Sequence, residues 1–174
     1  MKVCVKVYIR GRDAMKVNDL YGEMIYWIET HDGDPFMREL ADRHYSREKP
    51  GSKCFVGVGE KIVLKTPDSK ALFAWLYSDP KLRLDNLDGI NCTIFRNESN
   101  VLSSKLILEA EKFAIEKWGK NKSELMLFTY VNEDKVKSTY PGYCFKKAGW
   151  EYVRKNKSGK LRLFVKKVIL KRHK

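Results

Sequence analysis

The sequence lacks any pattern that is typical of a metal site. It has only three histidines and four cysteines among 174 residues. No two cysteines form a C-x-x-C pair, and no histidine is spaced to join a cysteine cluster, so we expect no zinc site. In a reducing compartment we expect free, largely buried thiols at all four positions, which are Cys4, Cys54, Cys92 and Cys144.

Long apolar runs are also missing. No run approaches the length of about 18 residues that predicts a membrane helix. The first ten residues alternate, and they lack the apolar block and small-residue cleavage site of a signal peptide. We therefore expect a cytoplasmic protein without membrane contact. Its hydrophobic content of 43% and its length predict one domain over residues 1–174 with a buried core.

Positive charge is concentrated near the C-terminus. The net charge is +13, and residues 146–174 hold twelve Lys or Arg against a single acidic residue, Glu151. A segment with this balance attracts phosphate backbones or acidic partners. This charge distribution predicts that the C-terminal hairpin contacts DNA. The alternative is that the lysine-rich surface only keeps the protein in solution.

Hydrophobic periodicity and turn residues predict an alternation of strands and helices. This order is typical of an α/β fold with a mixed sheet. A Pro at the first helical position after an Asp N-cap supports the second helix. The predicted strands are 3–9, 60–65, 71–77, 91–95, 124–131, 150–153 and 161–168, and the predicted helices are 18–30, 34–47, 103–118 and 142–149.

The order of elements over about residues 55–168 resembles that of the GNAT acyltransferases. The segment Phe145-Lys-Lys-Ala-Gly-Trp150 resembles the aromatic-x-x-x-Gly-Phe pattern that ends a short helix in that family. The resemblance implies a mostly antiparallel central sheet flanked by helices and a cofactor-binding core at approximately 90–168. It also implies acetyl-CoA or another acyl-CoA as the bound cofactor.

In that family a central strand leads into a loop and a helix that hold the pyrophosphate of coenzyme A. Unpaired N–H groups at a helix N-terminus favour bound phosphate, and Ser103 and Ser104 lie at such a terminus. The alternative for Ser103 is a simple N-cap. The other cofactor-binding residues that the resemblance implies are Ile94, Phe95, Arg96, Asn97, Ser138 and Phe145.

Two features depart from the family pattern. The phosphate loop of the family carries glycines, whereas the corresponding segment 98–103 reads E-S-N-V-L-S and has none. Glycine there lets the backbone approach the pyrophosphate closely, so we expect another loop conformation or altered cofactor binding. The tyrosine that serves as general acid in many members is replaced by Phe145, which cannot donate a proton.

Acyl transfer to an amine needs a base for the amine proton. His44 is the first candidate, because an unperturbed imidazole titrates near neutrality, and Tyr45 stands beside it. Glu98 is the second candidate, and Tyr130 is a candidate donor to the thiolate. The alternatives are a surface histidine, a solvated acid and a tyrosine packed in the sheet.

A narrower resemblance joins Gly142, Phe145 and Trp150 with the His44-Tyr45 pair. Their types and spacing are similar to those of the Mom-type phage DNA-modification proteins, which implies an adenine base in DNA as the target. We therefore expect an acyl-CoA-dependent N-acyltransferase with an unidentified amine acceptor. The alternatives are a Mom-like enzyme that modifies DNA and a non-catalytic binding module of the same fold.

Overall fold

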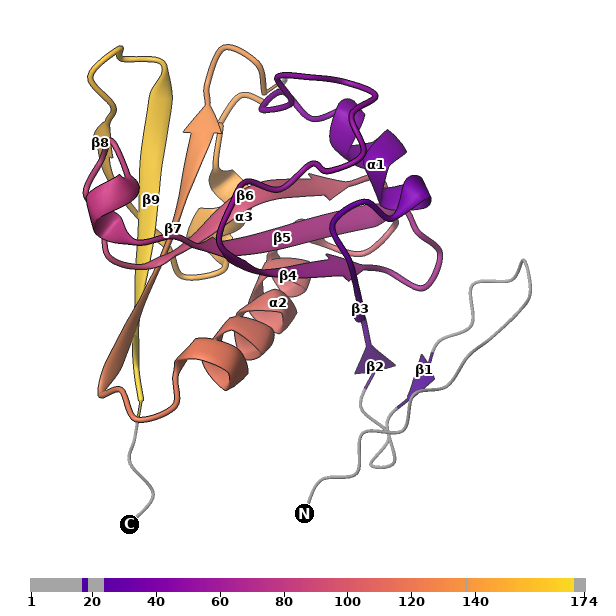
Figure 1. Cartoon of the computed structure of the whole chain (residues 1–174), viewed down its shortest axis with the longest axis horizontal. Helices are drawn as coiled ribbons and strands as arrows, with labels where there is room; N and C mark the ends of the chain where they lie inside the picture. Colours follow the sequence, from indigo (N-terminus) through magenta and orange to yellow (C-terminus); the bar gives the residue numbers. More distant parts are fainter. Residues whose placement is uncertain (1–16, 19–23, 137, 171–174) are drawn as a thin grey trace.

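The protein is built around one seven-stranded sheet (Figure 1). A computed structural model describes residues 17–18, 24–136 and 138–170. The strand order is β3-β4-β5-β6-β7-β9-β8. Every neighbouring pair is antiparallel except β6 and β7, which are parallel. The expected α/β class with a mostly antiparallel sheet is therefore confirmed.

The elements follow one another in the order given by their numbering. None of the helices within the described ranges combines the length and the apolar character needed to cross a membrane. The short strands β1 and β2 pair only with each other. The strands are β1 Val17–Asn18, β2 Met24–Ile25, β3 Ile28–Thr30, β4 Glu60–Lys65, β5 Ala71–Tyr77, β6 Ile90–Asn97, β7 Glu124–Asn132, β8 Glu151–Lys155 and β9 Leu161–Ile169. The helices are α1 Pro35–Asp42, the 3-10 helix η1 Pro80–Leu82, α2 Ser103–Trp118 and α3 Tyr143–Lys147.

Strongly patterned segments have the bounds that the sequence predicts. β4, β5 and α2 begin and end at the predicted residues, and β6, β7 and β9 extend one or two residues further. The apolar run of β5 is buried at six successive residues, because both faces of this central strand are covered. The predicted strand 3–9 lies outside the described residues.

The predicted helix 18–30 is wrong wherever the structure describes it. Ile28, Glu29 and Thr30 form β3 and pair with the end of β4. Trp27, just before β3, is buried and donates its indole N–H to the carbonyl of Leu106 at 2.8 Å. Sheet pairing and burial of this tryptophan therefore override the helical spacing of the apolar residues.

Helix α1 starts as predicted but ends early. Asp34 is its N-cap, and its carboxylate accepts from the N–H of Phe36 at 3.0 Å. The helix stops at Asp42 and not at Arg47, because the Asp42 carboxylate turns the chain by binding the Arg47 guanidinium at 2.6 Å. Phe36 is exposed, whereas the buried face consists of Met37, Leu40 and Ala41.

Helix α2 is fixed to its surroundings by indole hydrogen bonds. A buried indole N–H needs an acceptor, and each of the four tryptophans finds one on α2 or donates from it. These bonds fix α2 along its length to the segments that surround it. The pairs are Trp27 with Leu106 O, Trp75 with Ala110 O, Trp118 with the Glu60 carboxylate, and Trp150 with the Glu111 carboxylate.

The Glu111 carboxylate joins α2 to the end of the chain. It is buried and accepts from the Trp150 indole at 2.7 Å and from the Lys166 ammonium at 2.6 Å. Lys166 also donates to the carbonyl of Ala148 at 2.8 Å. Burial raises the pKa of Glu111 in spite of these partners. One carboxylate thus anchors α2, the turn after α3, and β9.

We expect Glu111→Ala to lower the free energy of unfolding by about 3 kcal/mol, because it leaves a partly buried ammonium and a buried indole N–H without their acceptor. Urea denaturation at neutral pH measures the loss. Glu116→Ala is the matched control, since Glu116 lies on the exposed side of the same helix, and it should change the value by less than about 0.5 kcal/mol. Equal effects of the two substitutions would refute the anchoring role.

Candidate functional site

The site begins where the two parallel strands separate. β6 and β7 pair through only three steps, and the last joins Cys92 to Thr129. The Thr129 hydroxyl donates to the Cys92 carbonyl at 2.9 Å. Beyond this step β6 stays paired with β5, and β7 stays paired with β9, but β6 and β7 no longer pair with each other. The sheet therefore opens in its middle.

A bulge in β6 lies at the same point. Ala74 of β5 is opposite Ile94, and the next residue, Trp75, is opposite Cys92, so Thr93 is an extra residue in β6. A bulge re-aims the side chains that follow it and is common next to functional sites. Ile94 consequently packs into the core on the α1 side of the sheet, while Phe95 packs on the other side.

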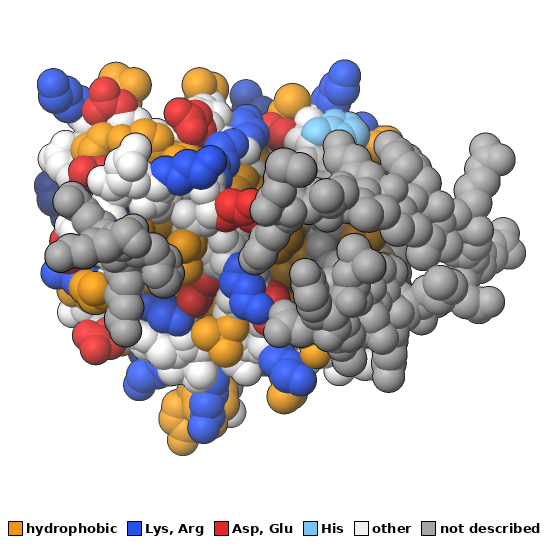
Figure 2. All heavy atoms as spheres, turned by 90° about the horizontal axis from the view of Figure 1, so that it is seen from below, with side chains coloured by type: hydrophobic (Ala, Val, Ile, Leu, Met, Phe, Trp, Pro, Cys, Tyr) orange, Lys and Arg blue, Asp and Glu red, His pale blue; other side chains and the backbone are white. Residues whose placement is uncertain are grey.

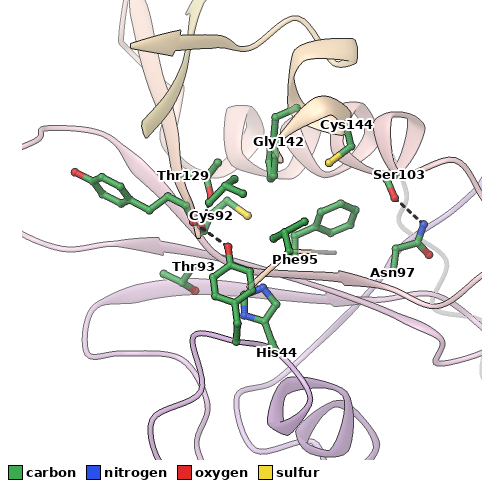
Figure 3. Close-up of a pocket in the computed structure, with 14 residues that line it drawn as sticks. His44, Cys92, Thr93, Phe95, Asn97, Ser103, Thr129, Gly142 and Cys144 are labelled. Carbon is green, nitrogen blue, oxygen red and sulfur yellow. Dashed lines mark hydrogen bonds between the residues drawn. The ribbon is translucent and has the colours of Figure 1, made fainter. Parts of the chain in front are cut away.

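A pocket of about 190 Å³ occupies the opening (Figure 3). Its walls come from the segment after α1, from β6, from the first residue of α2, from β7, from the segment that leads into α3 and from α3 itself. The residues that line it are His44, Tyr45, Cys92, Thr93, Phe95, Asn97, Ser103, Thr129, Tyr130, Val131, Val136, Gly142, Cys144 and Phe145.

The structure brings seven of the twelve predicted site residues together in this pocket. The other five do not line it. Ser138 is exposed, and its hydroxyl accepts from the N–H of Tyr140 at 3.3 Å. The seven are His44, Tyr45, Phe95, Asn97, Ser103, Tyr130 and Phe145, and the five are Ile94, Arg96, Glu98, Ser104 and Ser138.

His44 is buried. The alternative of a surface histidine, which the sequence also allowed, is therefore wrong. Its Nδ1 lies 2.7 Å from the Ser46 hydroxyl and accepts from the Ser46 N–H at 3.3 Å. A neutral imidazole whose Nδ1 accepts carries its proton on Nε2. Burial and the nearby Arg96 guanidinium lower the pKa of His44 to about 4. At neutral pH this ring is therefore a hydrogen-bond donor rather than a base.

Two tyrosines meet across the opening. The Tyr45 hydroxyl donates to the main-chain carbonyl of Tyr130 at 3.1 Å, and the Tyr45 ring lies 4.2 Å from the His44 ring. The Tyr130 hydroxyl donates to Asp85 at 2.9 Å. Burial raises the pKa of Tyr45 to about 12, and burial together with Asp85 raises the pKa of Tyr130 to about 12. Both hydroxyls stay protonated and both already have acceptors.

Glu98 lies outside the pocket in an ion-pair cluster. Its carboxylate accepts from Arg43 at 2.8 and 3.1 Å and from Arg96 at 2.6 Å. The Arg43 hydrogen bond, with the pairing to Arg96, lowers the pKa of Glu98 to about 2. Arg96 also donates to the carbonyl of Arg43 at 2.6 Å. Glu98 therefore fastens the segment after α1 to the end of β6, and its carboxylate is a very weak base.

The loop that lacks glycines is organised by Asn97. Its amide donates to Val101 O at 2.7 Å and to the Ser103 hydroxyl at 3.0 Å. Its oxygen accepts from the N–H and the hydroxyl of Ser99 at 2.9 and 2.7 Å. The N-cap of α2 is Leu102, which makes no side-chain cap bond. Ser103 is therefore not the cap, and it lies at the pocket wall on the first turn.

The sequence did not single out seven of the lining residues as site residues. Gly142 belongs to the recognised segment, and its φ of 84° is suited to glycine. A Cβ there would lie 2.3 Å from the Phe164 ring. Cys92, Thr93 and Thr129 lie at the bulge and at the strand separation, which a sequence does not display. Besides Gly142, the residues in this group are Cys92, Thr93, Thr129, Val131, Val136 and Cys144.

The described residues contain no group of three or more His, Cys, Asp or Glu side chains that could hold a metal ion. The pocket instead has an aromatic floor. Phe145 is buried and packs against Phe95, Trp150 and Phe164 with ring centroids 5.0 to 6.3 Å apart. A phenylalanine at this position thus serves packing.

Burial of neutral His44 makes stability depend on pH. The pKa of His44 is about 4 in the folded state and 6.5 in the unfolded state. The stability that comes with the neutral imidazole is therefore complete above about pH 6.5, and it is lost as the pH falls toward 4. Between pH 6.5 and pH 4, we expect the free energy of unfolding to fall by about 2–3 kcal/mol less in the His44→Gln variant than in the wild type. Urea denaturation at several pH values measures it. His31→Gln, at an exposed residue, is the control, and an equal flattening there would contradict the prediction.

No protein-family model matches the sequence, and no curated protein sequence matches it. Its function must therefore be inferred from the geometry and chemistry of the pocket.

Proposed function

We propose that the protein is an acyl-CoA-dependent N-acyltransferase of the GNAT type. The observation that carries the proposal is the separation of β6 and β7 after the Cys92–Thr129 step, around a pocket that reaches the first residue of α2 at Ser103. The order of a central strand, a loop, a long helix, a diverging strand and a short helix agrees with the GNAT resemblance of the sequence.

The opening suits the elongated arm of coenzyme A. Peptide groups that lose a cross-strand neighbour favour a ligand with amide groups of its own, and the pantetheine arm has two. At one end of the opening the uncapped N-terminus of α2 favours the pyrophosphate. Apolar walls at Phe95, Val131 and Phe145 suit the carbon chain.

Acyl-CoA would supply the acyl group as a thioester, and the chain would supply hydrogen-bond donors to the thioester carbonyl. Donors directed at the oxygen where negative charge develops usually contribute more to the rate of such reactions than any other single effect. Two sources lie in the pocket wall: the backbone at the Thr93 bulge, and the Nε2–H of His44. We therefore assign His44 to donation, which replaces its expected role as the base.

The proposal is tested by isothermal titration of the full chain with acetyl-CoA. We expect binding in the micromolar range, which corresponds to about −8 kcal/mol. Cys144→Trp should weaken it at least about tenfold, because Cys144 lines the pocket from α3 and a larger side chain would fill it. Tyr143→Trp is the matched control, since Tyr143 is exposed on the same helix.

Absence of binding at millimolar acetyl-CoA would refute the enzyme proposal and leave the non-catalytic binding module. Equal affinities of the Cys144→Trp and Tyr143→Trp variants would show that acetyl-CoA binds elsewhere. Thermal denaturation of both variants checks that each is folded.

A second candidate is a Mom-like enzyme that modifies adenine bases in DNA. On the face seen in Figure 2, the coloured lysine and arginine side chains are interspersed with acidic and hydrophobic ones. The hairpin β8–β9 has a single acidic residue, Glu151, and four of its basic side chains have no ion-pair partner among the described residues. They are Arg154, Lys157, Lys160 and Lys167.

If DNA is bound through this hairpin, the logarithm of affinity should fall linearly with the logarithm of salt concentration, by about 0.9 per phosphate contact. Fluorescence anisotropy with a labelled duplex measures the slope. Reversing Lys157 and Lys160 to Glu should reduce the slope by about two contacts. The same charge reversal at the exposed Lys49 and Lys53 should leave the slope unchanged. A slope near zero for the unmodified protein would refute the DNA-modifying candidate.

A further inference from the structure

The pocket has an unusual charge composition. Fourteen of the described residues line it, and none of these fourteen is Asp, Glu, Lys or Arg. Its ionisable groups are one imidazole, two phenols and two thiols. At neutral pH all five are uncharged, because the pKa of His44 is lowered and burial raises the pKa of each phenol and thiol. These groups belong to His44, Tyr45, Tyr130, Cys92 and Cys144.

The carboxylates nearest the pocket are already neutralised. Glu98 accepts from two arginines. Asp85 accepts from the guanidinium of Arg83 at 2.7 and 2.9 Å and from the hydroxyl of Tyr130. Among the described residues, a cation that entered the pocket would therefore meet neither of these carboxylates in an unpaired state.

An alkylamine is protonated at neutral pH and would enter such a pocket as a cation. Transfer of an unpaired ammonium out of water is strongly unfavourable. It would also have to lose a proton before it could attack, and the described lining residues offer no base for that proton, because the accepting nitrogen of His44 is bound by Ser46. An amine on an aromatic ring is neutral at the same pH and carries no such cost.

The walls suit a flat ring. The rings of His44 and Tyr45 lie tilted against each other on one side of the opening, with their centroids 4.2 Å apart, and both side chains line the pocket. Aromatic walls favour an aromatic ligand through stacking. The aromatic walls and the uncharged lining therefore favour the same class of ligand, a neutral aromatic amine.

We infer that the acceptor is an amine that is neutral at physiological pH, namely an amino group attached to an aromatic ring, and that alkylammonium compounds are excluded. This rests on the proposed acyl transfer. The amine nitrogen attacks the thioester carbonyl, a C–N bond forms and the C–S bond breaks. The proton lost by the nitrogen passes to the departing thiolate, so the products are an amide and a free thiol, without any oxidant or reductant.

Aniline and cyclohexylamine test the inference because each carries an amino group directly on a six-membered ring. Binding is measured by NMR titration of the labelled full chain, with and without acetyl-CoA, near pH 7. We expect aniline to bind at least about tenfold more tightly. With acetyl-CoA present, release of free thiol should be faster with aniline by a similar factor. The rate with cyclohexylamine should rise with pH as that amine loses its proton.

A carboxylate placed in the pocket should reverse the preference. Thr93→Asp adds one at the bulge, and Thr93→Asn is a control of the same shape without charge. We expect Thr93→Asp to favour the cyclohexylammonium ion and Thr93→Asn to keep the preference for aniline. The wild-type comparison decides the matter if either variant fails to fold.

Two failures are distinguishable. If acetyl-CoA does not bind, the proposed function is refuted, and the acceptor role falls with it. If acetyl-CoA binds but cyclohexylamine binds as tightly as aniline and reacts as fast at pH 7, only the inference about the acceptor is overturned.

Discussion

The hydrogen bond from the Thr129 hydroxyl to the Cys92 carbonyl marks the constraint on which the site depends. It closes the last step at which β6 and β7 are paired, and the opening starts at the next residue. The extra residue Thr93 lies directly after it. Strand separation and bulge together create a pocket in the middle of a sheet, where continuous pairing would leave no room for a ligand.

The opening is held by contacts on both of its sides. Behind it, the tryptophan bonds and the Glu111 carboxylate fix α2 and the Gly142–Trp150 segment. In front, the Arg43–Glu98–Arg96 cluster and the Tyr45–Tyr130 hydrogen bond fix the segment after α1. The ionised groups thus hold the structure around the pocket, while the groups that face it stay neutral. In the proposed acyl transfer, the pocket would therefore act through directed dipoles rather than through charges.

The sequence predicts the fold better than the site, for a physical reason. Continuous apolar runs such as Ala71–Tyr77 and one-faced periodicity such as Ser103–Trp118 are local properties, and they set the bounds of β5 and α2. The segment 18–30 has helical spacing, yet Ile28–Thr30 joins a sheet through β4, which lies 30 residues further on. Likewise His44, Asn97, Ser103 and Phe145 could be found from motif spacing. Cys92 and Thr93 could not, because a bulge arises from pairing between strands.

The missing glycines and the missing tyrosine each have a counterpart in the structure. Glycines permit close approach of a backbone to phosphate, and here the Asn97 side chain compacts the loop with four hydrogen bonds. The tyrosine position holds Phe145, whose ring is packed among three aromatic rings. An acid at that position would protonate a thiolate when the amine proton has been lost to a separate base. Where no base is present and the amine binds in its neutral form, the proton that the amine loses can protonate the departing thiolate. The absence of a tyrosine acid and the absence of a carboxylate base are then consistent with one and the same reaction.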